Sequence, residues 1–312
     1  MKNKGQVTIF IILAVVIVGG VIAYFALRDG FGTSIPEDMR PVYDYYLSCL
    51  EETTAQGIAL MGEQGGYIEA PEFEAGSAYI PFSSQLDFFG QGVPYWMYVS
   101  GNNVLKESVP TKNEMERQLA SYVSERLVDC DFGDFELSGY DVYIEEGDAT
   151  AEINELSVDV AVGNRMTIYK DDNSVLVNDH DLSVSSKLGK FYDMAVSVYD
   201  SEKSDMFLEK YALDVMRLYA PVDGVELSCA PKFFIDSEIR ENLTRGLEIN
   251  MNSIKLKGDY YNLASADSEY FVRDVGFDVD ESVNVMYNPA WPTRIEIYGD
   301  RVAKPVGTQA GL

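Results

Sequence analysis

The sequence has few of the residues on which catalytic and metal sites depend. Its 312 residues include one histidine, His180, and three widely separated cysteines. No C-x-x-C, H-E-x-x-H, G-x-S-x-G or P-loop motif is present, which argues against a zinc site, a serine or cysteine hydrolase and a nucleotide-binding loop. His180 lies in the polar run of residues 178–181, so we expect a solvated turn in which substitution by Ala changes neither folding nor function. We predict no catalytic, cofactor-binding or metal-ligating residue.

Basic residues are also scarce. Lys and Arg number 24 against 51 Asp and Glu, which gives a net charge of -27. Nucleic-acid binding requires clustered Lys and Arg that neutralise phosphates, so we expect no nucleic-acid partner. Two acid-rich segments, residues 129–136 and 171–173, do not match the D-x-[DN]-x-[DN]-G calcium loop, and we interpret them as exposed turns.

Charge is absent from residues 7–27, an apolar run of 21 residues. At about 1.5 Å rise per residue, a helix of this length crosses a hydrocarbon core of about 30 Å. Lys2 and Lys4 precede the run and an acidic chain follows it, so the positive-inside rule places residues 1–6 in the cytoplasm. We therefore predict a single-pass cell-membrane protein, bound to the bilayer through residues 7–27, with its C-terminal domain extracytoplasmic.

The apolar run carries two short motifs. Gly19 and Ala23 form a small-xxx-small pair, which predicts self-association through close helix approach. The tripeptide KGQ at residues 4–6 resembles the class III, prepilin-type processing site of archaeal pilins, which are cleaved after the glycine. That resemblance implies an alternative, a subunit cleaved between Gly5 and Gln6.

Helical periodicity predicts amphipathic helices beyond the membrane segment. The first begins near Pro36 and is ended by Gly65 and its neighbouring glycine. The second begins at a capping box formed by Thr111 and Glu114. The expected helices cover residues 36–64, 111–130, 188–218 and 237–251.

Residues 140–186 change to short alternating segments separated by Gly, Asp and Asn, a pattern typical of an antiparallel β-meander. Residues 67–110 are rich in Gly, Pro and aromatics and predict a loop-rich insert with short strands. The fold class is therefore α+β, with an N-terminal transmembrane helix followed by an ectodomain of amphipathic helices and an antiparallel β-meander. We expect a boundary near Ser138, between a membrane-proximal helical region (28–137) and an α+β part (138–312).

Three cysteines allow three single disulfides, and the helical stripes select one of them. Cys49 lies on the apolar stripe of the first predicted helix, and Cys130 ends the stripe of the second. Packing of these faces would bring Cys49 and Cys130 within bonding reach, and an oxidising compartment would preserve the bond. Cys229 is then expected to remain an unpaired thiol.

Several segments together resemble a family of proteins. They are MKNKGQVTIFIILAVVIV at the N-terminus, SCLEETTAQGIALMGEQGGYI with Cys49, RLVDC with Cys130, and LSCAP with Cys229. The chain resembles uncharacterised single-span envelope proteins of small-genome, DPANN-type archaea. The resemblance implies an archaeal envelope and carries no known activity.

The leading hypothesis is a membrane-anchored extracytoplasmic structural or interaction protein of an archaeal cell envelope, without catalytic activity. Its expected partners are other envelope or surface proteins. One alternative is the pilin-like subunit, assembled through its hydrophobic N-terminal helix. The other is a carboxylate-dependent surface hydrolase, since paired carboxylates leave no sequence spacing. Asn242 begins the only N-x-[ST] sequon and is the expected glycosylation site of an outside domain.

Overall fold

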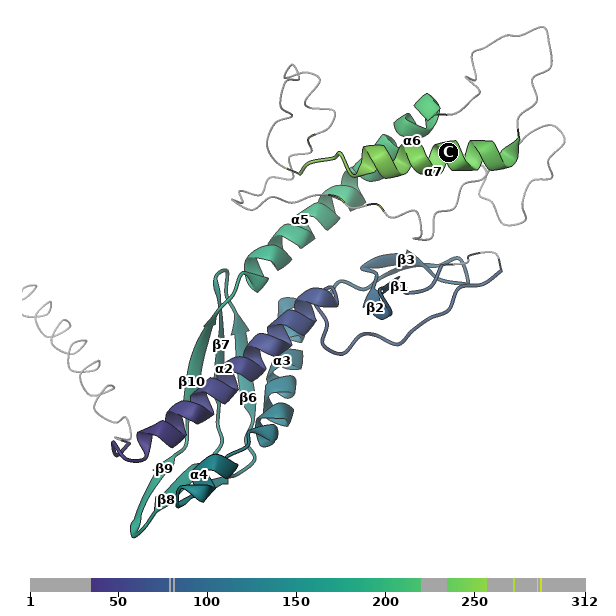
Figure 1. The fold of residues 1–312 in the computed structure, drawn as a ribbon. Helices are drawn as coiled ribbons and strands as arrows, with labels where there is room; N and C mark the ends of the chain where they lie inside the picture. The colour runs from purple at the N-terminus through teal and green to yellow at the C-terminus, as the bar shows by residue number, and fades with distance from the viewer. Residues whose placement is uncertain are drawn as a thin grey trace, which may run out of the picture. The chain divides into compact units, whose positions relative to one another are not determined.

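The computed structural model describes residues 35–78, 80, 82–219 and 235–256, together with residues 272, 285 and 287 (Figure 1). Within these residues the fold is α+β, with helices and antiparallel sheets. The apolar run at residues 7–27, the Gly5–Gln6 site and Cys229 lie outside the described residues. None of the helices in the described part is both long enough and apolar enough to span a bilayer.

Two helices form where the N-terminal half of the sequence predicts them. α2 (Arg40–Glu63) is followed by Gly65 and Gly66, which have φ of 65° and 98°. The Gly66 N–H donates to the carbonyl oxygen of Met61 at 2.8 Å, a C-terminal closure that favours glycine. α3 (Lys112–Arg126) is capped by the Thr111 hydroxyl, which accepts a hydrogen bond from the Glu114 N–H at 3.2 Å.

Short helical elements follow α3. The 3-10 helix η1 (Leu127–Asp129) leads to Cys130, and α4 (Gly133–Leu137) begins three residues later. The Asp131 side chain accepts a hydrogen bond from the Gly133 N–H at 2.9 Å, which stabilises the turn between them. The second predicted helix, residues 111–130, is therefore α3 extended by η1.

The helix predicted over residues 188–218 is wrong in one respect, because the structure divides it. α5 (Leu188–Asp205) and α6 (Phe207–Tyr219) are separated by Met206, which has a left-handed φ of 48°. The Glu202 carboxylate accepts a hydrogen bond from the Leu208 N–H at 3.0 Å and so caps the new helix. Apolar periodicity continues through the break, so the sequence pattern alone does not reveal it.

The insert between α2 and α3 contains two small hairpins. β1 (Gln85–Phe88) pairs antiparallel with β2 (Gln91–Pro94), and β3 (Met97–Val99) pairs antiparallel with β4 (Leu105–Glu107). The Trp96 Nε1–H donates to the carbonyl oxygen of Gly65 at 2.8 Å. This arrangement agrees with the predicted loop-rich insert that contains strands.

The strands of residues 140–186 form two three-stranded sheets, and the predicted single β-meander is wrong in topology. One sheet has the order β5 (Tyr140–Ile144), β8 (Met166–Lys170), β9 (Asn173–Val177). The other has the order β10 (His180–Ser185), β7 (Ser157–Val162), β6 (Ala149–Ile153). Alternation fixes which side chains share a face, whereas the choice of partner strand depends on long-range packing. Thus Val142 pairs with Ile168 rather than with the next strand in the chain.

The described residues form two compact units, each built from separate stretches of the chain. The first contains described residues within 35–54, 120–150 and 160–182, and the second contains those within 55–119, 151–159 and 183–287. A single division near Ser138 does not describe this arrangement. In the first unit, buried side chains come from helices and strands alike: Met39, Val42, Tyr46, Leu50, Val123, Val162, Met166 and Ile168.

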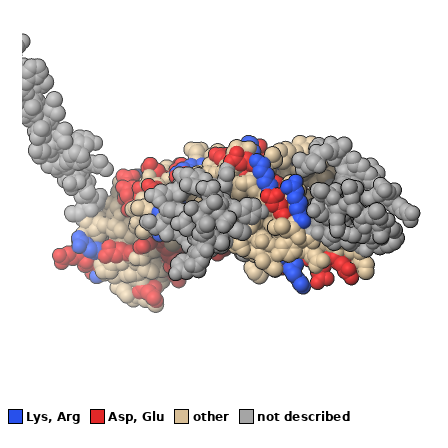
Figure 2. Space-filling model, turned by 90° about the horizontal axis from the view of Figure 1, so that it is seen from above, with Lys and Arg blue, Asp and Glu red and all other residues tan. Residues whose placement is uncertain are grey.

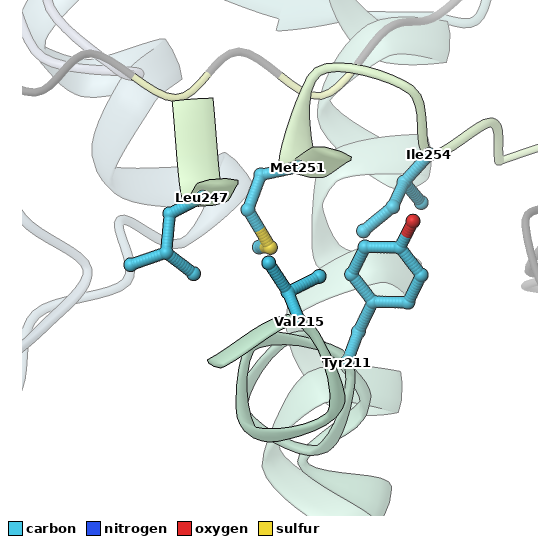
Figure 3. Close-up of a cluster of buried hydrophobic side chains, with 5 residues drawn as sticks. All are labelled: Tyr211, Val215, Leu247, Met251 and Ile254. Atoms are coloured by element: carbon cyan, nitrogen blue, oxygen red, sulfur yellow. The ribbon is translucent and has the colours of Figure 1, made fainter. Parts of the chain in front are cut away.

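In the second unit, α6 and α7 (Asp236–Met251) pack through apolar side chains. Figure 3 shows Val215 and Tyr211 of α6 facing Leu247, Met251 and Ile254. A Cβ added to Gly246 of α7 would lie 2.7 Å from the Tyr219 ring, so glycine permits the close approach of the two helices.

Candidate functional site

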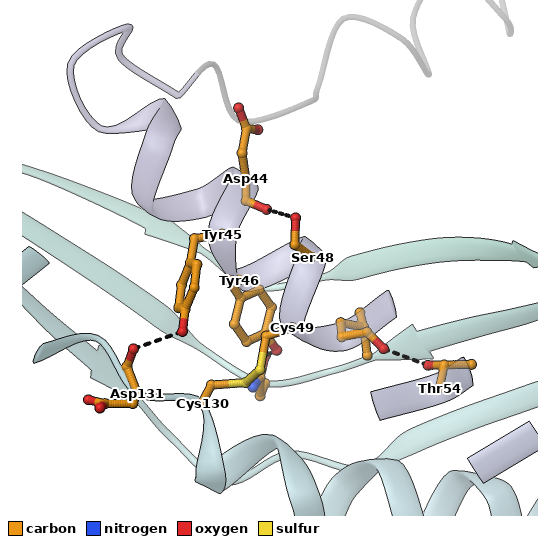
Figure 4. The surroundings of a disulfide bond; sticks show 10 residues. Asp44, Tyr45, Tyr46, Ser48, Cys49, Thr54, Cys130 and Asp131 are labelled. Atoms are coloured by element: carbon orange, nitrogen blue, oxygen red, sulfur yellow. Dashed lines mark hydrogen bonds between the residues drawn. A yellow bond between two sulfur atoms is a disulfide. The ribbon is translucent and has the colours of Figure 1, made fainter. Parts of the chain in front are cut away.

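A disulfide holds the centre of the first unit. Cys49 of α2 is bonded to Cys130, which follows η1, with 6.2 Å between their Cα atoms (Figure 4). This is the pair that the helical stripes predict. Nearby, the Tyr45 hydroxyl donates to the carbonyl oxygen of Asp131 at 2.9 Å. One face of α2 is therefore joined to the segment after α3 by a disulfide and by a hydrogen bond.

The next residue on α2, Tyr46, is fully buried. Its hydroxyl donates to Oδ1 of Asn164 at 3.1 Å, and Asn164 is itself only 4% exposed. Burial raises the pKa of Tyr46 to about 12, so the hydroxyl remains a neutral donor. The bond fixes the Asn164 amide, because a buried polar pair is costly to separate.

His180 lies in the core and not in the solvated turn that we predicted. It begins β10, is fully buried, and its ring centroid is 4.7 Å from that of Tyr46 and 5.6 Å from that of Tyr43. Burial is the main cause of its lowered pKa, since burial disfavours the imidazolium. Strand alternation in the sequence could have predicted this burial, because residues 180, 182 and 184 lie on the same face of β10.

Beside this core the first unit contains a pocket of about 890 Å³. Its apolar lining includes Leu127, Phe132 and Val162, which are buried, and the half-buried Val142 and Ile144. Six carboxylate residues also line it, and none of the lining residues is Lys or Arg: Glu125, Asp131, Glu136, Glu145, Glu146 and Asp148. The pocket thus combines an apolar floor with a negatively charged rim.

The pocket walls are held by backbone contacts. The Gly163 N–H donates to the carbonyl oxygen of Asp148 at 3.0 Å, and the Glu145 N–H donates to that of Arg165 at 2.9 Å. A Cβ on Gly147 would lie 2.5 Å from both Cα and Cβ of Asn164, so this close approach requires glycine. The loop between β5 and β6 is therefore fitted directly against Asn164.

The carboxylates of the pocket do not form a metal-ligating cluster with other described residues. Within the described residues, no three Asp, Glu, His or Cys side chains lie close enough to hold one metal ion. All six lining carboxylate residues are solvent-exposed. The Arg165 guanidinium lies 3.6 Å from the carboxylate of Glu145. Figure 2 shows that acidic side chains on the visible face are spread over the surface and not gathered in one place.

The sequence identified the acid-rich segment 129–136 but not the pocket that it helps to form. Asp131 and Glu136 come from this segment, whereas Glu145 to Asp148 come from the loop after β5. The other acid-rich segment, residues 171–173, lies at the turn between β8 and β9, where Asp171 has φ of 51°. Asn242 is exposed on α7.

One pair of carboxylates bears on the hydrolase alternative. Burial, followed by a hydrogen bond with Glu209, raises the pKa of Glu202 to about 7. A raised pKa suits a general acid. However, the Glu202 carboxylate also accepts the Leu208 N–H at the start of α6, which gives it a sufficient role as a helix cap.

The geometry of the first unit offers a bounded pocket, and it is the strongest candidate site among the described residues. Glu202 caps α6, and His180 fills the core. Comparison of the chain with models of protein families, with curated proteins and with solved structures finds no match.

Proposed function

We propose that this chain is a membrane-anchored, extracytoplasmic interaction protein of an archaeal cell envelope, held by residues 7–27 with its N-terminus in the cytoplasm. The observation that carries the proposal is the disulfide between Cys49 and Cys130. Disulfides persist in oxidising compartments and are rare in the cytosol. The bond therefore supports an outside location, in agreement with the charge distribution around the apolar run.

The disulfide also suits a domain that has to remain folded outside the cell. It joins residues 81 apart in the sequence, so its loss would release a long loop in the unfolded chain. The acidic composition supports the same setting, because a net charge of -27 favours a solvated surface and repels anionic lipid.

Protease accessibility tests the topology. The full chain is expressed in a prokaryotic host, and intact spheroplasts are treated with protease. We expect digestion of the domain that begins at α2, while a cytoplasmic marker protein stays intact. Protection of the domain until the cells are lysed would overturn the proposal.

Peptide mapping without reductant tests the disulfide in the same preparation. We expect one linked pair of peptides, containing Cys49 and Cys130, and a free thiol at Cys229. Free thiols at Cys49 and Cys130 in protein alkylated before lysis would remove the main support for an outside location.

The pilin-like alternative is motivated by the KGQ tripeptide at residues 4–6. In that case the hydrophobic helix would leave the bilayer and assemble with other copies. N-terminal mass spectrometry of protein from native membranes separates the two proposals. A start at Met1 or Lys2 supports the anchor, and a start at Gln6 supports processing.

A further inference from the structure

The hairpin of β1 and β2 ends in two aromatic side chains, Phe88 and Phe89, which we call the aromatic tip. We propose that the aromatic tip inserts into the surface of the lipid bilayer that anchors the chain. This inference rests on the anchor at residues 7–27 in the proposed function and adds a second bilayer contact from within the folded domain.

The aromatic tip is exposed in a way that is unusual for large apolar side chains. Phe89 is 93% exposed, and no other large hydrophobic side chain among the described residues is more exposed. The ring of Phe88 lies edge-on to that of Phe89, with 4.7 Å between the centroids. Exposed apolar groups that lie together mark a contact with a membrane or with another protein.

The backbone at the tip favours a different residue. Phe88 pairs with Gln91, so Phe89 and Gly90 form a two-residue turn with φ of 51° and 87°. Such turns favour Asn or Asp before glycine, because both central residues have positive φ. The turns between β3 and β4 and between β8 and β9 have Asn103 and Asp171 at their left-handed positions. Phe89 therefore strains its own turn, and strain of this kind is characteristic of functional positions.

The hairpin holds the aromatic tip in a fixed place. The Asp87 carboxylate accepts a hydrogen bond from the Gly90 N–H at 2.9 Å and so closes the turn. At the other end of β1, the Gln85 Nε2 donates to the carbonyl oxygen of Pro71 at 3.0 Å. Because the tip is preorganised, little conformational freedom is lost when it inserts.

Charge around the tip favours a lipid interface with neutral headgroups. Residues 75–105 contain one charged side chain, Asp87, in a chain with 51 acidic and 24 basic residues. Insertion of this segment therefore removes little charge from water. The acidic remainder of the chain would be repelled by an anionic surface and by a second copy of itself. Without Lys or Arg to attract phosphate, the contact depends on apolar insertion.

The tether keeps the bilayer within reach of the domain. The chain from residue 27, where the apolar run ends, to residue 35 spans at most about 30 Å when fully extended. Insertion of two rings is too weak to hold a free protein at a membrane. A tethered domain, however, meets the surface at a high effective concentration, so a weak contact is sufficient.

Fluorescence of the full chain in phosphatidylcholine nanodiscs tests the insertion. Phe89→Trp places an indole at the tip, and wild type, with Trp96 and Trp291, supplies the background. Leu137→Trp is the matched control, because Leu137 is 89% exposed in the first unit. With brominated phosphatidylcholine, we expect quenching of the fluorescence that Phe89→Trp adds and none of that added by Leu137→Trp.

Three outcomes of this experiment would overturn the proposal. Unquenched fluorescence from Phe89→Trp would place the tip in water. Equal quenching of both variants would show that the whole domain lies against the bilayer without a specific contact. Fluorescence that lipid does not quench, but that shifts to the blue when envelope proteins are added, would assign the tip to a partner protein.

Phe89→Asn separates insertion from folding. Asn suits the left-handed position, so the variant should melt at or above the temperature of wild type. With a photoreactive phosphatidylcholine in the nanodisc, we expect labelling of peptides from residues 7–27 and 85–94 in wild type. Labelling of the hairpin peptide should fall to background in Phe89→Asn and should be unchanged in the control Leu137→Asn. Hairpin labelling that persists in Phe89→Asn would refute the insertion.

The protease assay on spheroplasts tests the location of the domain independently. An outside domain in which Phe89→Trp is not quenched would refute this inference alone. A domain on the cytoplasmic side in which Phe89→Trp is quenched would refute the proposed location alone.

Discussion

The core around Cys49 and the pair formed by α6 and α7 are stabilised in different ways. The first combines a disulfide with buried polar groups, among them His180 and the bond between Tyr46 and Asn164. The second is a cluster of apolar side chains contributed mainly by two helices. The stability of the first region should therefore depend on reductant, and the stability of the second should depend mainly on its apolar contacts.

The difference shows that a small core can be stabilised either by a disulfide with buried polar groups or by apolar burial alone. Apolar burial stabilises by about 25 cal/mol per Å² and needs no particular solution condition. A disulfide acts mainly on the unfolded chain and depends on the compartment. Hydrogen exchange measured by mass spectrometry can follow the two regions separately in one sample.

Removal of the disulfide should have the largest effect. Cys49→Ser with Cys130→Ser should destabilise the first unit by about 4 kcal/mol, because a loop of this length is constrained in the unfolded chain. Faster exchange should be confined to peptides from α2 and residues 120–150, with α6 and α7 unchanged. Cys229→Ser is the control and should leave both regions as in wild type. Equal protection with and without reductant would contradict the prediction.

Truncation of Leu247 should accelerate hydrogen exchange in α6 and α7 and leave exchange in the first unit unchanged. This side chain is 4% exposed in the α6–α7 cluster, so Leu247→Ala should cost about 3 kcal/mol locally. Exchange in α6 and α7 should accelerate to the same extent in oxidised and reduced protein. Ile249→Ala, at a position 56% exposed on the same helix, should have little effect. A dependence on reductant would refute the contrast between the regions.

The sequence predicted the features that local pattern determines. Helical stripes located α2, α3 and α7, and the stripes of the first two selected Cys49 and Cys130 as neighbours. The sequence also predicted the end of α2 at glycine and the helix cap at Thr111, because each depends on a few adjacent residues. The transmembrane segment stays a prediction.

Features that depend on distant contacts were missed. Met206 breaks a helix although its neighbours continue the apolar period, and Val142 pairs with Ile168 across an inserted hairpin. His180 is buried because Tyr43 and Tyr46 of α2 cover it. The pocket unites loops whose individual patterns indicated only exposed acidic turns.

Gly147 tests the fit of the pocket loop. A Cβ at this position would lie 2.5 Å from Asn164, so Gly147→Ala should destabilise the first unit by about 1–3 kcal/mol. Gly163→Ala is the matched control, because its added Cβ would be no closer than 3.7 Å to another atom. Chemical denaturation should show a lower midpoint for Gly147→Ala alone. Similar midpoints for both variants would contradict the close approach.

His180 should make the disulfide core sensitive to acid. Burial lowers its folded pKa below the unfolded value of about 6.5, so the unfolded state binds more protons between these two values. Stability should therefore fall as the pH falls through about 6.5 and level off below the folded pKa. His180→Gln removes the titrating group. The difference in the free energy of unfolding between wild type and variant should therefore shrink or reverse as the pH falls. A difference that is independent of pH would refute this contribution.

Glu202 should give the α5–α6 junction a pH dependence of opposite sign. Its folded pKa is raised to about 7, mainly by burial and then by Glu209, so the folded state binds more protons than the unfolded state. This contribution is fully present below about 4.5 and is lost as the pH rises through about 7. Glu202→Gln keeps an acceptor for the Leu208 N–H and should slow hydrogen exchange in α6 above the folded pKa. Glu248→Gln, an exposed change on α7, should not, and equal effects of the two would indicate only the loss of general negative charge.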